Sequence, residues 1–279
     1  MQGTQNMIEC TYSDKQMPYM IHYHNVHEIV FVQAGFVEFT INGCTYQVGP
    51  GNLIFISNTE EHQMKVLLGK YLRYYALFSS SQLIAMLGNP LLCTPFMSRA
   101  KQFHHIFSVD SITEQITGLF QQMTAEMASS EPFSQDIVAS AFRQLMILCY
   151  RTDPQYFHHS PHGVKSVLLD VQRYIDENLS EKLSVSDLAQ QFFLSESYFS
   201  HIFKDWTGFS PQRYIIMRRI SLAKDLLSSQ NLSLDIVSDR CGYTTTSQFV
   251  SSFKKETGMT PGKFRKNLRL QHASMSTVE

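Results

Sequence analysis

A sequence pattern in the C-terminal half occurs twice at a constant offset of 50 residues. The pattern FKxxTGxxP begins at Phe203 and again at Phe253. Self-similarity at a fixed period indicates a duplicated structural unit, and two copies are too few to form a solenoid. The sequence therefore predicts two equivalent helical modules within residues 163–270.

Each copy has the pattern of a short helix, a tight turn and a second amphipathic helix. In the first copy, Ser184 begins a capping-box pattern and Ser195 is a good N-cap for the second helix. The apolar residues of that second helix recur at helical spacing and predict its buried face: Phe199, Ile202, Phe203 and Trp206. This is the helix-turn-helix pattern, whose second helix enters the major groove of DNA.

The opposite faces of the two second helices carry the candidate DNA-binding residues. They are Ser197, Ser200, His201 and Lys204 in the first copy, and Ser247, Val250, Ser251 and Lys254 in the second. Hydroxyl groups can bond to several base edges, and lysines suit phosphates. The set lacks the arginine–guanine and asparagine–adenine pairings of strong direct readout, so DNA shape is expected to contribute to specificity.

The charge distribution favours a nucleic-acid partner for the same half of the chain. The net charge is only −1, but residues 1–160 hold 8 basic and 12 acidic residues, whereas residues 161–279 hold 15 and 12. Such asymmetry is a mild indication of nucleic-acid binding, and a solvated basic surface would account for it about as well.

Residues 168–268 resemble the DNA-binding domain of the AraC/XylS family of transcription regulators. The resemblance is carried by the stretches 195–204, 207–211, 219–227, 241–243 and 253–265. It implies a central helix at about 211–228 that links two helix-turn-helix units, so that both enter adjacent major grooves. By matching position, the resemblance adds Thr246 to the residues that are expected to bind DNA. Phe193 stands where the family usually has a small turn residue, and Ser238 where it usually has alanine.

The first ninety residues predict β structure. The short apolar runs 29–32, 37–41 and 53–56 are separated by Ala34-Gly35, by Asn42-Gly43 and by a Gly-Pro-Gly-Asn turn. Asn-Gly between two such runs is a strong hairpin signal, and many short strands predict a small barrel or jelly roll. From Ser111 the apolar residues follow helical spacing and predict an antiparallel helical pair joined by 128–133.

These patterns predict a two-domain α+β protein. An N-terminal cupin-like barrel with a helical pair is expected over 1–151, a linker over 152–162, and an all-α domain with two helix-turn-helix units over 163–279. The linker is predicted from a stretch rich in proline and histidine that has no periodicity.

Histidines gather at the start of the predicted barrel. His22, His24 and Glu28, followed by six residues and Gly35, resemble the first metal-binding motif of cupins, and His62 lies where the second motif supplies its histidine. Three imidazoles and a carboxylate would suit Fe, Mn, Ni or Zn, which makes a metal sensor or metal-dependent enzyme the alternative function.

We favour a barrel without metal or cofactor. Gln16 replaces the glycine that opens the first motif, and Asn58 and Glu60 replace residues usual in the second. The regulators that this chain resembles commonly carry a similar barrel without metal. The expected role is to bind a small organic effector through His22, His24, Glu28, Tyr46 and His62, with a sugar as the class implied by the resemblance alone.

The remaining expectations concern partners and location. Apolar helices at 111–150 predict a homodimer, operator DNA is the expected partner, and the resemblance leaves RNA polymerase open as another. The chain shows no catalytic motif such as a phosphate-binding loop or a zinc helix, so a non-enzyme is expected. Five scattered cysteines and apolar runs too short for a membrane span favour the cytoplasm.

Overall fold

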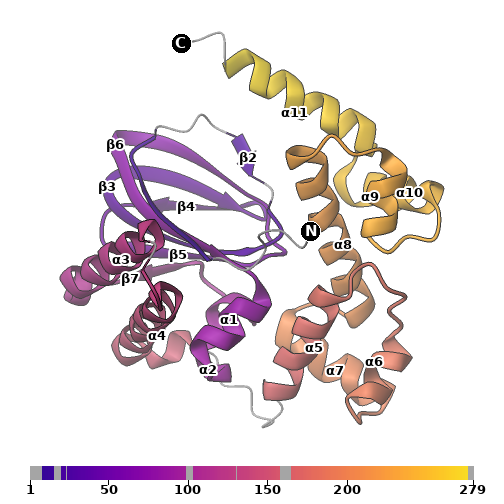
Figure 1. Cartoon of the computed structure of the whole chain (residues 1–279), viewed down its shortest axis with the longest axis horizontal. Helices are drawn as coiled ribbons and strands as arrows, with labels where there is room; N and C mark the ends of the chain where they lie inside the picture. The colour runs from indigo at the N-terminus through magenta and orange to yellow at the C-terminus, as the bar shows by residue number, and fades with distance from the viewer. Residues whose placement is uncertain are drawn as a thin grey trace. The chain divides into compact units, whose positions relative to one another are not determined.

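The computed structural model describes residues 8–15, 20–22, 24–98, 103–129, 131–157 and 165–275. The chain divides into two compact units, which are described separately. The first is formed mainly by residues 26–173 and the second mainly by residues 174–279. A mixed sheet-and-helix unit followed by an all-helical unit confirms the predicted two-domain α+β fold (Figure 1).

The first unit is built on a seven-stranded antiparallel sheet. Its strand order is β1-β6-β3-β5-β7, while β2 pairs with β6 and β4 pairs with β3. The strands are β1 (Glu9–Ser13), β2 (Met20–His22), β3 (His27–Ile41), β4 (Cys44–Val48), β5 (Asn52–Ile56), β6 (His62–Phe78) and β7 (Ile106–Ser108). Figure 1 shows these strands curving around a common interior, as expected for a cupin-like barrel.

One part of the strand prediction was wrong. The runs 29–32 and 37–41 are not separate strands joined by a turn at Ala34-Gly35, because both belong to the 15-residue strand β3. The register between β3 and β6 shifts between Val32 and Val37, so the dipeptide forms a bulge. Gly35 has φ +84°, and a Cβ atom there would lie 2.8 Å from the carbonyl oxygen of Lys70.

The Asn42-Gly43 hairpin is confirmed. Ile41 pairs with Cys44, and the two turn residues have φ values of 46° and 82°. Positive φ at both central positions defines the type I′ turn, which matches the twist of the flanking strands.

The interior of the sheet is apolar, and the predicted helical pair covers its outer side. Val30, Val32 and Ile54 belong to the buried core cluster that fills the interior. On the other side of β3, the ring of Phe31 stacks on Phe120 of the helical pair at 5.5 Å between centroids. The helices of this unit are α1 (Ser80–Leu87), α2 (Pro90–Met97), α3 (Thr113–Ala128) and α4 (Ser134–Thr152).

The predicted linker begins with ordered chain. The short 3-10 helices of the first unit are η1 (Asp110–Ile112) and η2 (Pro154–Tyr156), and the second follows α4 directly. Phe157 is buried, and residues 158–164 lie outside the described residues. The exact domain boundaries stay a prediction.

The second unit consists of helices. They are the C-terminal end of α5 (Lys165–Glu177), α6 (Val185–Gln191), α7 (Glu196–Thr207), α8 (Pro211–Ser229), α9 (Leu234–Arg240), α10 (Thr246–Thr257) and α11 (Pro261–Met275). The predicted central helix at 211–228 corresponds to α8.

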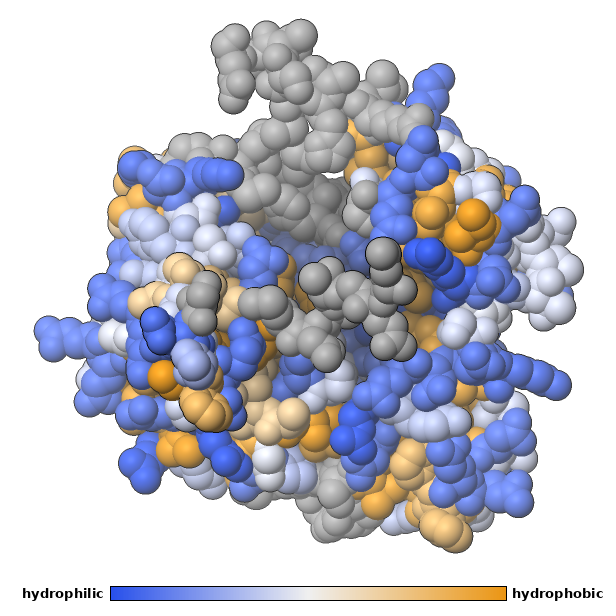
Figure 2. Space-filling view, in the orientation of Figure 1, coloured by the Kyte–Doolittle hydropathy of each residue, from blue (hydrophilic) through white to orange (hydrophobic). Residues whose placement is uncertain are grey.

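The visible face of the molecule is a mosaic of hydrophilic residues and small apolar patches (Figure 2). Among the described residues, no helix is both long enough and apolar enough to cross a membrane.

Candidate DNA-binding surface and barrel site

The first helix-turn-helix unit is formed by α6 and α7. The Ser184 side chain accepts a hydrogen bond from the Asp187 amide and caps α6. In α7, Phe199 and Phe203 are completely buried and their rings pack edge to face at 5.4 Å. This packing fixes the rotation of α7 and leaves Ser197, His201 and Lys204 exposed, with Ser200 half-buried.

The second helix-turn-helix unit repeats this arrangement in α9 and α10. The Thr245 side chain caps α10 by accepting a hydrogen bond from the Gln248 amide. Phe249 and Phe253 are completely buried, with ring centroids 5.7 Å apart. The predicted DNA-binding residues on the opposite face are exposed or half-buried: Thr246, Ser247, Val250, Ser251 and Lys254.

One of these residues already has an internal partner. The Thr246 hydroxyl donates a hydrogen bond to the carboxylate of Asp235 in α9. Its side chain therefore helps to join the two helices of its unit. The assignment of the nine residues to DNA binding stays a prediction.

The turns of the two units differ at the equivalent position. Gly242 ends α9 with φ +70°, and Phe193 ends α6 with φ +57°. The left-handed conformation favours glycine, so the Phe193 backbone is strained. Its side chain is 96% exposed, so no packing offsets this strain.

Arg219 of α8 connects the two helix-turn-helix units. The sequence analysis did not predict a role for this residue. Its Nε donates to the carbonyl oxygen of Leu179 at 3.1 Å, and its Nη2 donates to that of Glu181 at 2.7 Å. Both acceptors lie in the loop before α6. The guanidinium also lies 5.6 Å from the ring centre of Tyr243, in the turn of the second unit. Two adjacent arginines between the apolar residues Met217 and Ile220 of a helix were the available signal.

The neighbouring arginine has a structural role. Arg218 is only 2% exposed, and its Nε donates to the carboxylate of Asp176 in α5 at 2.6 Å. The two arginines together attach α8 to the helix and the loop that precede α6.

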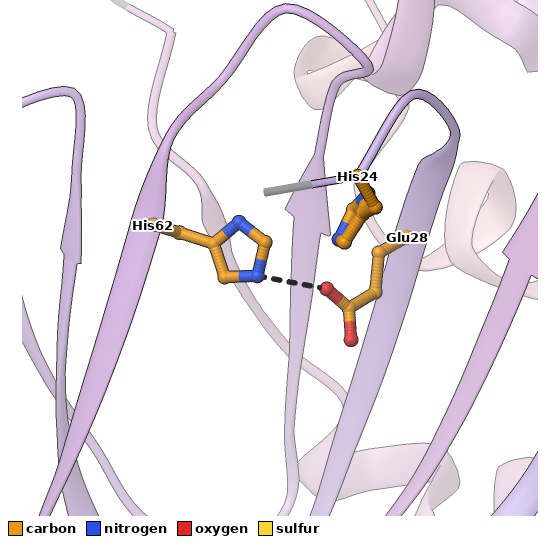
Figure 3. Close-up of side chains that lie close together, drawn as sticks. All are labelled: His24, Glu28 and His62. Atoms are coloured by element: carbon orange, nitrogen blue, oxygen red, sulfur yellow. Dashed lines mark ion pairs between the residues drawn. The ribbon is translucent and has the colours of Figure 1, made fainter. Parts of the chain in front are cut away.

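The structure brings together three of the predicted barrel residues. The Nε2 atom of His62, the first residue of β6, lies 3.1 Å from Oε2 of Glu28 in β3. One ligand atom from each of His24, Glu28 and His62 lies within 4.8 Å of the others. Figure 3 shows the three side chains pointing toward one another.

The other two predicted barrel residues are placed differently. The backbone of His22 pairs with that of His62, but its side chain lies outside the described residues. The Tyr46 hydroxyl lies 2.9 Å from Nδ1 of His105, whose Nε2 lies 3.0 Å from Oε1 of Glu60. Tyr46 therefore belongs to a second polar cluster.

The residues that depart from the cupin motif have partners within the first unit. The side-chain amide of Asn58 donates to the Ser80 hydroxyl at 3.1 Å, and Glu60 accepts from the backbone amide of Ser57 at 2.7 Å. These contacts order the loop between β5 and β6. They give Asn58 and Glu60 structural roles.

Tyr71 is a barrel residue that sequence analysis missed. It is completely buried, and its hydroxyl has no hydrogen-bond partner among the described residues. Burial raises the pKa of this hydroxyl, nearby Arg73 lowers it and Glu28 raises it further. Its position after a long run of strand residues carried no signal in the sequence.

A cavity of about 210 Å³ includes His62 in its wall. The other lining residues are Thr40, Asn42, Gly43, Glu61 and Gln63. The Asn42 side chain accepts a hydrogen bond from the Glu61 amide at 3.1 Å, so the hairpin turn is tied to the loop that leads to His62.

Comparison with known proteins agrees with this arrangement. A cupin domain model matches residues 15–78, and a helix-turn-helix domain model matches residues 188–267. The chain is 27% identical over 253 residues to the probable transcriptional regulator LumQ of Photobacterium leiognathi, covering 90% of this chain and 93% of the relative. It is 26% identical over 245 residues to the HTH-type transcriptional activator RhaS of Escherichia coli (strain SE11), covering 88% and 86%.

A solved structure shares the fold of the whole chain. The 1.65 Å structure of ToxT from Vibrio cholerae covers 93% of this chain and 97% of its own, with a TM-score of 0.58 and 12% sequence identity.

The fold, the two helix-turn-helix units and the relatives define a transcription regulator with an N-terminal cupin domain. The matches to a cupin domain and a helix-turn-helix domain agree with the predicted resemblance to the AraC/XylS family of transcription regulators.

Proposed function

We propose that the chain binds its operator through the outer faces of α7 and α10 and that a small polar molecule bound by the barrel controls this binding. One observation supports the DNA-binding part. The two helices bury equivalent phenylalanine pairs and present equivalent polar faces, with Lys204 and Lys254 at the same position.

The DNA-binding part is tested by substitutions that separate base contacts from phosphate contacts. His201→Ala and Ser247→Ala should reduce the ratio of operator affinity to random-duplex affinity. Lys204→Ala and Lys254→Ala should weaken binding to both duplexes about equally and lower the salt slope by about 1. Lys70→Ala, an exposed lysine of the first unit, is the control. Equal losses on both duplexes for all four variants would contradict the assignment.

The effector-binding part rests on the cavity beside His62. Its lining offers a hydroxyl, two amides, a carboxylate and an imidazole, which are the groups that bind sugar hydroxyls. Its volume of about 210 Å³ is below the roughly 300–1,000 Å³ of drug-sized ligand sites, which favours a small molecule such as a sugar. The apolar core cluster fills the interior of the barrel. The effector is therefore expected to contact polar groups at the ends of the strands.

The effector is tested by screening monosaccharides against the full chain. A matching sugar should raise the melting temperature and change operator affinity, since the two equilibria are reciprocally coupled. Gln63→Ala should remove both effects, whereas His104→Ala, at a separate histidine, should keep them. A sugar that stabilises the protein but leaves operator affinity unchanged at saturation would contradict the regulatory role.

A metal ion is the second candidate ligand of the barrel, and the cluster of His24, Glu28 and His62 supports it. Two atoms bound to one metal at about 2.1 Å and at right angles are about 3.0 Å apart. The 3.1 Å between His62 and Glu28 fits two such positions. Two imidazoles and a carboxylate would suit Fe, Mn, Ni or Zn, and the metal would supply a Lewis acid for ligand binding. Stoichiometric metal in the purified chain, lost in Glu28→Gln, would establish this candidate.

We also propose a homodimer that uses the helical pair. Phe133, at the start of α4, is 76% exposed, and Ile137 and Leu148 of this helix are half-buried. Sedimentation at micromolar concentration should give a dimer, and Phe133→Glu should give a monomer. A strictly monomeric wild-type chain would exclude this proposal.

A further inference from the structure

The second unit contains a cavity of about 400 Å³ at the junction of its two helix-turn-helix units. We call it the junction pocket. On one side it is lined by Ser180 and Lys182, from the loop before α6. On the other side it is lined by Thr244 and Gln248, from the turn and the first part of α10. One wall of the pocket therefore precedes the first helix-turn-helix unit, and the other wall includes the start of α10 in the second.

Arg219 lies in the wall of this pocket and holds its two sides together. Two of its N–H groups donate to Leu179 and Glu181 in the loop before α6. A guanidinium has five N–H donors. Two of them bond to the loop before α6, so three remain to bind a ligand among the contacts of the described residues. These contacts fix the guanidinium in place, so a ligand would meet a preorganised donor.

The charge of the pocket suits a singly charged anion. Lys182 and Arg219 contribute two positive charges, and Asp239 contributes one negative charge. Neither cation forms an ion pair with another described residue. The side chains of Ser180, Thr244 and Gln248 add hydrogen-bond donors. A phosphodiester carries one negative charge and two free oxygens, and arginine binds such oxygens well.

We propose that the junction pocket binds one phosphate of the DNA strand that runs between the two major grooves read by α7 and α10. This inference rests on the proposed DNA-binding function. Phosphate contacts fix the register of a protein on DNA and carry no sequence information directly. A phosphate held by Arg219 and Lys182 would set both recognition helices in register at once, because the same arginine joins the two units.

The test combines Lys182→Gln with an operator whose phosphates are replaced one at a time by neutral methylphosphonates. Lys182→Gln should lower affinity for operator and random duplex about tenfold each, the factor expected for one charge-assisted hydrogen bond. One methylphosphonate between the two recognition elements should weaken wild-type binding by a similar factor. The same replacement should weaken the binding of Lys182→Gln clearly less than that of the wild type, because the variant has already lost part of its contact with this phosphate.

Lys255→Gln, at an exposed lysine near the end of α10, is the matched control and should respond to that methylphosphonate as the wild type does. If every methylphosphonate affects Lys182→Gln and wild type equally, the inference is wrong. If inorganic phosphate stabilises the free protein through Lys182 while all methylphosphonate operators bind normally, the ligand is a free phosphate and the DNA assignment is wrong. If the wild type binds no duplex, the proposed function itself fails.

Discussion

The backbone of Gly242 lies directly against the carbonyl group of Leu179. A Cβ atom at this glycine would come within 2.2 Å of the Leu179 oxygen and within 2.6 Å of Nη2 of Arg219. The turn of the second helix-turn-helix unit therefore meets the loop that precedes the first unit at a point where no side chain fits. This contact and Arg219 together fix the separation of the two units.

Gly242→Ala should destabilise the second helix-turn-helix unit by about 2–5 kcal/mol, because the left-handed backbone and the clash both disfavour a Cβ atom at this position. Gly258→Ala is the matched control, since Gly258 has φ +74° but open space around its Cβ position. The control should lose only about 1–2 kcal/mol. Urea unfolding followed by circular dichroism measures both, and equal losses would show that the contact with Leu179 is unimportant.

Ser238→Ala should stabilise the protein by about 1–2 kcal/mol, because a buried hydroxyl without a partner costs its desolvation free energy. Ser238 is 3% exposed, and its hydroxyl has no hydrogen-bond partner among the described residues. Ser252→Ala is the control, because the Ser252 hydroxyl is bonded to that of Tyr243 at 2.9 Å. That variant should lose about 1 kcal/mol. A loss of stability in Ser238→Ala would mean that its hydroxyl has a partner.

Phe193→Gly should raise the free energy of unfolding by about 1 kcal/mol, since glycine adopts the left-handed conformation without strain. The exposed ring contributes little packing that could be lost. Phe192→Gly is the control, because Phe192 has φ −98° and is half-buried, so this change should destabilise. Trp206, the single tryptophan, is buried in α7 and reports the unfolding of this region by fluorescence. Unchanged or lower stability in Phe193→Gly would show that the ring has an internal role.

The elements with strong local signals could be predicted from the sequence. The Ser184 cap, the buried face of α7 and the Asn42-Gly43 turn all depend on contacts within a few residues. The duplication strengthened the helical prediction, because each copy supported the other.

The features that depend on long-range contacts could not be predicted. Ala34-Gly35 has a turn composition, but pairing with β6 on the other side keeps β3 continuous through a bulge. Tyr46 is expected to bind the effector together with Glu28 because both carry a polar group, whereas its partner His105 lies 59 residues away. The carbonyl acceptors of Arg219 lie about 40 residues before it and have no side-chain signature at all.

Lys224 should make the stability of the protein depend on pH above pH 8. This lysine of α8 is buried, and burial lowers its pKa from 10.5 to about 8, although the nearby Glu256 raises it. Between these two values the unfolded chain holds the proton and the folded chain does not, so unfolding takes up a proton. The free energy of unfolding contributed by this group therefore rises as the pH increases from about 8 to 10.5.

Lys224→Met removes this titration, so the stability of the wild type relative to the variant should increase across that pH range. The increase is expected to be on the order of 3 kcal/mol, the free energy that corresponds to a shift of this size. Below pH 8 the amine is charged in both states, and the difference between the two proteins should be constant. Lys255→Met, at an exposed lysine of α10, should follow the wild type at every pH. Parallel profiles for wild type and Lys224→Met from pH 7 to 10.5 would mean that the folded protein keeps this lysine charged.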